Sequence, residues 1–194
     1  MATKVGVNRR QLIIEAATKS FSLFGYKATT MDQVAKIANV GKGTIYTFFK
    51  TKEELFGEIV NSLIKEMKQA ADETFDPSLT FHENVHQTLY RILEFRREHQ
   101  LTIKLFQEEK EMGTKEVTEV MEMMENAVIH YIKDKVITYI KKGEIQECDP
   151  ELTAFVILKL YVALIFDWEK NHKPLKKEQI AQLFKQYVFK GLST

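Results

Sequence analysis

Residues 30–49, TMDQVAKIANVGKGTIYTFF, predict two short helices joined by a tight turn. Thr30 and Gln33 have the spacing of a capping box, so the first helix begins directly after Thr30. Asn39 and Gly41 tolerate the backbone conformations that a turn requires, and the second helix covers about residues 42–49. Two short helices connected in this way are typical of a helix-turn-helix.

The second predicted helix has one apolar face and one polar face. Ile45 and Phe49 lie four residues apart and face a small core, whereas Thr44 and Thr47 face outward and can contact base edges or a thymine methyl. Because the second helix of such a motif enters the major groove by its N-terminal end, this outward face predicts DNA binding. The predicted contacts are Thr29, Thr30, Lys42, Gly43, Thr44, Tyr46, Thr47, Phe48 and Lys52.

The predicted contacts have different roles. Thr30 and Lys52 stand at the heads of two helices, where they hold the DNA backbone and fix the register without reading sequence. Gly43 lets the helix backbone approach a phosphate closely, and Tyr46 points its hydroxyl at a phosphate. Phe48 belongs clearly to neither face. Its two alternatives are inward packing and contact with a sugar or a thymine methyl.

The spacing of apolar residues in the rest of the chain is mostly three and four, which predicts an all-α protein. We expect about nine helices, with the others at about residues 8–24, 52–75, 80–98, 100–111, 114–142, 150–170 and 176–191. Residues 1–52 then form a helix-turn-helix DNA-binding domain, and residues 53–194 form a larger helical ligand-binding and dimerisation domain. The core of the first domain is predicted from Leu12, Ile13, Ala16, Ala17, Phe21, Phe24, Val34, Ile37, Ala38, Val40, Ile45 and Phe49.

Charge is distributed unevenly along the chain. Residues 1–52 contain nine Lys and Arg against two acidic residues, a net of +7, whereas the whole chain of 194 residues carries +1. A basic segment of this kind attracts a polyanion and releases its counterions on binding. Arg9 and Arg10 lie where a flexible arm could reach a neighbouring groove. The alternatives are a solvated basic surface, or a helical adaptor whose basic end binds a protein or a membrane surface.

Residues 24–56, FGYKATTMDQVAKIANVGKGTIYTFFKTKEELF, closely resemble the DNA-binding region of the tetracycline-repressor-like (TetR) transcription regulators. The resemblance spans about Ile13 to Phe56, and glycine, lysine, tyrosine and phenylalanine recur at the family's fixed offsets. The sequence departs from the family at Phe48, which cannot donate to a phosphate, and at the turn residues Asn39 and Gly41. The resemblance implies a homodimeric repressor that binds a pseudo-palindromic operator and is released by a small-molecule effector.

The segment after residue 52 offers apolar residues for the pocket and the dimer that the resemblance implies. Candidates for the pocket are Leu63, Met67, Tyr90, Leu93, Leu105, Phe106, Met121, Met124, Val128, Tyr131, Phe155 and Trp168, although such a stripe is more often core. The pocket contains no evident buried charge, so we expect an apolar effector. The dimer interface is predicted from Leu152, Phe155, Val156, Val162, Phe166, Ile180, Leu183, Phe184, Tyr187 and Val188.

Other chemistry is sparse in the sequence. We find no catalytic triad, phosphate-binding loop or dinucleotide fingerprint, so no enzyme activity, cofactor or metal is predicted. His82 and His86 have a spacing that can bind zinc but lack a third ligand, and we expect a solvated surface pair. The acidic run at residues 107–111 is expected to be a solvated face. Cys148 is the single cysteine and no membrane or signal segment is evident, so we expect a cytoplasmic protein.

Overall fold

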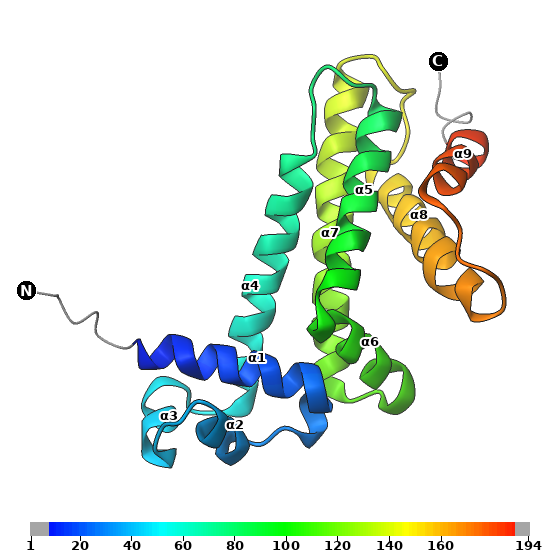
Figure 1. Ribbon diagram of the computed structural model, residues 1–194. Coiled ribbons are helices and arrows are strands. Elements are labelled where there is room, and N and C mark those ends of the chain that lie inside the picture. The colour runs from blue at the N-terminus through cyan, green and yellow to red at the C-terminus, as the bar shows by residue number, and fades with distance from the viewer. Residues whose placement is uncertain (1–7, 189–194) are drawn as a thin grey trace, which may run out of the picture. The chain divides into compact units, whose positions relative to one another are not determined.

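The computed structural model describes residues 8–188, apart from the side chains of Leu93, Arg96, Arg97, Glu98, Ile165, Phe166 and Glu169. All regular secondary structure in this part of the chain is helical, and no strand is present there, as predicted (Figure 1). Its helices are α1 (Arg9–Ala28), α2 (Met31–Ile37), α3 (Lys42–Phe48), α4 (Lys52–Glu73), α5 (Phe81–Glu98), α6 (Gln100–Met112), α7 (Lys115–Lys141), α8 (Pro150–Val162) and α9 (Lys177–Tyr187).

The predicted helix over residues 150–170 is correct only in its first part. Asp149 caps α8 through its side chain, which accepts hydrogen bonds from the backbone N–H groups of Glu151 and Leu152. Regular α-helix then ends at Val162 and continues as a π-helix, Ala163–Asp167, and a 3₁₀ turn, Trp168–Lys170. Residues 163–170 contain no Gly or Pro, so the sequence offers no helix-breaking residue that would predict this change. The last predicted residues of α9, 189–191, lie outside the described residues.

The described helices fall into two compact units, and the first consists of residues 1–65 and 96–123. In this unit α2, α3 and α6 all pack against α1. An aromatic cluster fills the core, where the ring centroids of Phe21 and Tyr26 lie 5.1 Å and 4.6 Å from that of Phe56. Most of the predicted core is confirmed. Leu12, Phe24 and Ile37 are instead exposed, because they lie at the edges of their helical stripes.

A break in α1 at Gly25 is held by a buried carboxylate from α6. Gly25 has φ of 84°, which favours glycine, and a side chain there would also overlap the Glu108 carboxylate. The break leaves the N–H groups of Tyr26 and Lys27 without helical partners, and Glu108 accepts both, at 2.6 Å and 2.9 Å. Thr114 also donates to this carboxylate, at 3.1 Å. Glu108 is only 2% exposed, so the expectation of a solvated face at residues 107–111 is wrong at this residue.

The second unit consists of residues 66–95 and 124–194, and a buried asparagine organises one end of it. Asn84 on α5 bonds the backbone N–H and carbonyl of Asp76 and the carbonyl of Leu79, which fixes the loop before α5. Its side chain also donates to the hydroxyl of Tyr139 on α7, at 2.8 Å. The predicted capping box of Thr80 and Glu83 is confirmed at the start of α5.

His82 and His86 on α5 are part-buried, so the expectation of a solvated pair is wrong. Burial lowers the pKa of both imidazoles. The ammonium groups of Lys185 and Lys177, both on α9, lower these pKa values further, while an acidic neighbour of each histidine acts in the opposite direction. Both histidines are therefore kept neutral in the folded protein at neutral pH.

We expect Glu108→Gln to destabilise the protein by about 1–3 kcal/mol. The glutamine amide has one oxygen in place of two, so one of the two buried backbone N–H groups would face the NH₂ group and lose its acceptor. Unfolding in urea would measure the change. The matched control is Glu111→Gln, because Glu111 is exposed on the same helix and its replacement should change the unfolding free energy little. Equal stability of the two variants would contradict the role assigned to Glu108.

The depressed histidine pKa values predict a loss of stability in acid. Above the unfolded pKa of 6.5 the imidazoles are neutral in both states, so their contribution is fully present. As the pH falls below that value, the unfolded chain takes up protons that the folded protein resists, and stability is lost. Replacing His82 and His86 together by Gln should flatten the change in unfolding free energy between about pH 7.5 and about pH 5.5. An unchanged slope in the double variant would disprove this assignment.

Candidate DNA-binding site

The turn between α2 and α3 orients the candidate recognition helix. Asn39 adopts a left-handed conformation with φ of 53°, and the Val40 N–H donates to the Ala35 carbonyl at 3.0 Å. Because the chain reverses direction here, Ile45 and Phe49 point into the core, where they are 0% and 1% exposed. The predicted assignment of these two residues to the inward face is confirmed.

The opposite face of α3 is open to solvent. Lys42, Gly43, Tyr46, Thr47 and Phe48 are exposed, and Thr44 is part-buried. Tyr46 and Phe48 are each 38% exposed, so both aromatic rings stand partly in solvent. Of the two alternatives for Phe48, inward packing is therefore excluded. The face combines a cation, hydroxyl groups and two rings, which suits phosphates, base edges and thymine methyls together.

Two polar groups of this face already have partners within the protein. Lys42 forms an exposed ion pair with Asp32 of α2, at 2.8 Å, and this contact raises the pKa of the ammonium. The Thr47 hydroxyl donates to the Thr44 carbonyl, at 2.7 Å. With its proton occupied in this way, Thr47 presents its methyl group and its oxygen lone pairs to a ligand.

Thr29, Thr30 and Lys52 occupy different environments. Thr30 is exposed and caps α2, accepting the Gln33 N–H at 3.2 Å. Thr29 is only 1% exposed and donates its hydroxyl to the Gly25 carbonyl at 2.8 Å, so the predicted direct DNA contact is wrong for this residue. Lys52 donates to the carbonyls of Tyr26 and Thr29, at 2.9 Å and 3.1 Å, and its ammonium therefore also serves to join α4 to the end of α1.

Other residues support this site in ways that the sequence interpretation did not predict. The predicted arm is wrong for Arg10, which is helical and bonds Glu58 of α4, with its guanidinium 5.2 Å from the centre of the Phe49 ring. The Tyr26 hydroxyl donates to Glu53 at 2.7 Å. Glu108 could have been found from spacing, since it follows Leu101 and Leu105 on the buried stripe of α6.

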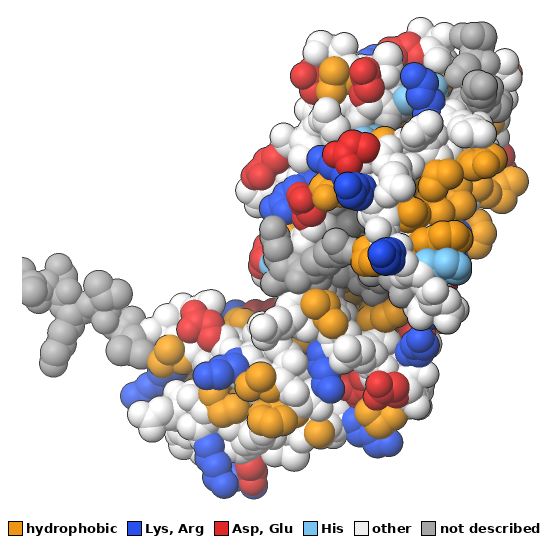
Figure 2. Space-filling model, turned by 45° about the vertical axis from the view of Figure 1, so that its right-hand side comes forward, with side chains coloured by type: hydrophobic (Ala, Val, Ile, Leu, Met, Phe, Trp, Pro, Cys, Tyr) orange, Lys and Arg blue, Asp and Glu red, His pale blue; other side chains and the backbone are white. Residues whose placement is uncertain are grey.

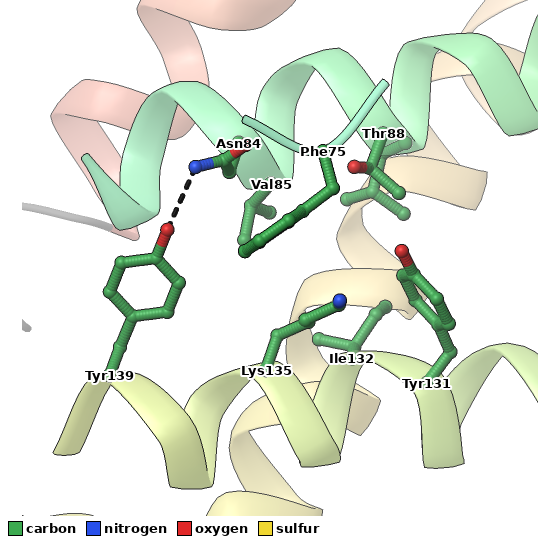
Figure 3. A pocket seen from close by; sticks show the side chains of 9 residues that line it. Phe75, Asn84, Val85, Thr88, Tyr131, Ile132, Lys135 and Tyr139 are labelled. Atoms are coloured by element: carbon green, nitrogen blue, oxygen red, sulfur yellow. Dashed lines mark hydrogen bonds between the residues drawn. The ribbon is translucent and has the colours of Figure 1, made fainter. Parts of the chain in front are cut away.

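The predicted pocket residues belong to both compact units. Among them, Tyr131 lines a small cavity of the second unit (Figure 3), and Trp168 lines a larger pocket of the same unit. Leu63, Met67, Leu105, Val128 and Tyr131 are buried, Tyr90, Phe106, Met121 and Met124 are part-buried, Phe155 and Trp168 are exposed, and the Leu93 side chain lies outside the described set.

The predicted dimer residues are partly covered and partly exposed. Ile180 and Phe184 are buried within the protomer, where Phe184 packs against Tyr161 with ring centroids 5.0 Å apart. Val162, Leu183 and Val188 are part-buried, and the Phe166 side chain is outside the described set. Leu152, Phe155, Val156 and Tyr187 are exposed. Figure 2 shows hydrophobic side chains gathered on the side of the molecule where α8 lies.

The described residues contain neither a metal-binding cluster nor a membrane-spanning helix. No three side chains from His, Cys, Asp and Glu come together there in a way that could hold a metal ion. None of the helices within residues 8–188 combines the length and the apolar character needed to cross a bilayer.

Comparison with known proteins connects this fold to a family. The family model described as bacterial regulatory proteins, tetR family, matches residues 13–59. The chain is 67% identical over 189 residues to the uncharacterized HTH-type transcriptional regulator YhgD of Bacillus subtilis (strain 168), with 97% of this chain and 99% of the relative covered.

Solved structures support the same conclusion at the level of the fold. The SmeT–triclosan complex superposes with a TM-score of 0.73 at 16% identity, covering 96% of this chain and 92% of that chain. The fatty acid degradation regulator FadR from Bacillus halodurans superposes with a TM-score of 0.70 at 17% identity, covering 92% of this chain and 93% of that chain. Since the helix-turn-helix matches the family model and the similarity to YhgD extends over nearly the whole chain, the protein belongs to the TetR family of helix-turn-helix transcriptional regulators.

Proposed function

We propose that the protein is a repressor that binds a pseudo-palindromic operator as a homodimer and is released by a small, largely apolar effector. The proposal rests on the exposed face of α3, where the side chains of Lys42, Tyr46, Thr47 and Phe48 are open to solvent. On the opposite face, the buried side chain of Ile45 packs into the core and holds the helix in place. This arrangement supports insertion of α3 into a major groove.

The proposed roles on DNA follow from the chemistry of each side chain. Thr47 and Thr44 read base edges or thymine methyls, and Phe48 adds an apolar contact to a thymine methyl or a sugar. Lys42, Tyr46, Thr30 and the backbone at Gly43 hold phosphates and set the register. We propose that Lys52 also binds a phosphate. Its replacement would not test this role cleanly, because the loss of its two carbonyl partners would also loosen α4 from α1.

The exposed face of α8 supports the proposed dimer. Leu152, Phe155 and Val156 have i, i+3 and i+4 spacing, so they form one apolar stripe, and they are 60%, 43% and 46% exposed. A second copy of the chain related by a two-fold axis would cover this stripe with the same stripe of its partner. The same two-fold axis would place two recognition helices on two half-sites of a palindrome.

The proposed effector response is supported by the family and by the subjects of the similar structures. One is a complex with triclosan, and another is a regulator of fatty acid degradation. For this chain we infer an effector that binds one conformation of the dimer more tightly than the DNA-binding conformation, since a ligand without such a difference cannot shift the equilibrium.

Two substitutions on α3 should affect DNA binding differently. Thr47→Ala should change the preferred base at one position of each half-site and cost about 1 kcal/mol on the preferred duplex. Lys42→Gln should weaken binding to all duplexes alike and reduce the slope of log affinity against log salt by about 1 for each phosphate that Lys42 neutralises. Duplexes selected from a random pool, followed by fluorescence anisotropy at several salt concentrations, would measure both effects.

The control for the DNA experiment is Lys115→Gln, which removes one exposed positive charge at the start of α7 and is not on α3. It should leave base preference unchanged. If the Lys42 and Thr47 variants bind selected and random duplexes as the unmodified protein does, α3 is not the recognition helix.

Val156→Glu should convert the dimer to a monomer. A carboxylate on the apolar stripe would have to be buried without a partner, which should raise the dimer dissociation constant about a hundredfold or more. Sedimentation velocity at micromolar concentration would report the change. Leu23→Glu places the same charge on an exposed apolar position of α1 and should leave the dimer intact. A Val156→Glu variant that still sediments as a dimer would rule out this surface.

A further inference from the structure

One face of α5 carries two histidines and a tyrosine in line, and α9 packs against it. His82, His86 and Tyr90 recur at every fourth residue, so they form one stripe along the helix, and all three are part-buried. The ammonium of Lys177, at the start of α9, lies 3.9 Å from the centre of the Tyr90 ring. The centre of the His86 ring is 6.3 Å from the same point, so this imidazole and this ammonium share one tyrosine as a neighbour.

A second lysine of α9 lies near the other histidine. Burial lowers the pKa of both imidazoles, and the charge of Lys185 lowers that of His82 further, as the charge of Lys177 does for His86. The two lysines therefore meet the two histidines in reverse order, which means that α9 runs antiparallel to α5. Protonation of either histidine would bring two positive charges together at the contact between these helices.

One carboxylate opposes each lysine. Glu83, on α5 itself, favours the protonated form of His82, and Glu178 of α9 does the same for His86. Glu83 is also engaged in the cap of α5, where it accepts the Thr80 hydroxyl at 2.7 Å. Burial and the lysine outweigh the carboxylate at each histidine, because the pKa of both imidazoles is lowered.

A small apolar contact holds α9 in place. The helix has eleven residues, of which Ile180 and Phe184, one turn apart, are buried. Phe184 packs against Tyr161 of α8, and the remaining residues of α9 are part-buried or exposed. A short helix with so little buried surface belongs to the parts of a fold that open locally before the rest unfolds.

We propose that α9 detaches from α5 in mild acid, when protonated His82 and His86 repel Lys185 and Lys177. At neutral pH the imidazoles carry no charge and α9 stays on the stripe. Once α9 has detached, the histidines face water and take up protons near their ordinary pKa of 6.5, which the docked state resists. The docked state is therefore fully favoured above that pH and progressively less favoured below it.

The detachment also bears on the proposed dimer, because Leu183 and Tyr187 of the predicted interface lie on α9. We expect the dimer to weaken at the same pH as α9 opens, and this consequence rests on the proposed function. The opening itself is measured on α9 without DNA and without reference to a partner copy. A dimer that persists while α9 opens would remove α9 from the interface and leave the detachment intact.

Hydrogen–deuterium exchange of the full-length protein, followed by mass spectrometry at about pH 7.5 and about pH 5.5, would measure the opening. Exchange times are scaled for the pH dependence of the chemical rate, so that a remaining difference reports the structure. Peptides from α9 should exchange several-fold faster at the lower pH. Peptides from α7 should stay protected over the same times, because their exchange requires the whole unit to unfold.

Replacing the histidines or the lysines should reduce the acid response to different extents. His82→Gln together with His86→Gln leaves no imidazole to protonate, so the ratio of α9 exchange at the two pH values should fall to about 1. Lys177→Met together with Lys185→Met should lower the ratio without abolishing it, because burial still opposes protonation. Loss of the contact with Tyr90 may loosen α9 in this variant, but it does so at both pH values and cancels in the ratio.

A third variant should act in the opposite direction. Glu178→Gln removes the carboxylate that favours protonated His86, so it should raise the ratio. The matched controls are His172→Gln and Lys142→Met, which should keep the ratio of the unmodified protein. His172 is an exposed histidine before α9, and Lys142 lies at the end of α7, 4.8 Å from the centre of the Tyr139 ring.

The proposal is overturned if α9 exchanges equally at the two pH values, if the double histidine variant keeps the full acid response, or if Glu178→Gln lowers the ratio. It is also overturned if α7 loses protection together with α9, because acid would then unfold the whole unit and not release one helix. Circular dichroism at neutral pH establishes that each variant is folded before its ratio is compared.

Discussion

The first compact unit depends on one buried carboxylate that is held by hydrogen-bond donors. Glu108 accepts two backbone N–H groups at the break in α1 and a hydroxyl from Thr114, just before α7, so its charge is stabilised by dipoles. The break at Gly25 sets where the chain leaves α1 for α2, and α2 in turn supports α3. The position of α3, the candidate recognition helix, therefore depends on a residue that is distant from it in the sequence.

The helix-turn-helix can be predicted from the sequence because its determinants are local. The cap at Thr30, the turn at Asn39 and the inward pair Ile45 and Phe49 each follow from spacing within a few residues. The role of Glu108 is harder to assign, because an acidic residue in a helical sequence is usually solvated and its partners here are mostly backbone groups. The burial of Thr29 escapes prediction for a related reason, since it depends on the break at Gly25.

The second unit can be predicted as helices but not as a site. Apolar spacing identifies a buried stripe and cannot say which neighbouring helix covers it, so pocket and interface residues cannot be told apart by pattern alone. The structure shows which of the predicted interface residues are covered within the protomer: Phe184 packs against Tyr161, whereas Leu152 is exposed. Lys135 lines the small cavity of this unit, and no sequence pattern places the charge of that lysine among aromatic rings.

The ion pair between Lys42 and Asp32 also bears on how α3 would leave DNA. Asp32 is a tethered competitor whose carboxylate lies 2.8 Å from the Lys42 ammonium. A phosphate that takes Lys42 must displace this carboxylate and then lie near its negative charge. Because every duplex offers the same phosphate, the exchange lowers affinity for all duplexes by the same factor and shortens the time that α3 spends on each of them. The strength of binding on this face, and not its base preference, would then be set partly by an acid that touches no base.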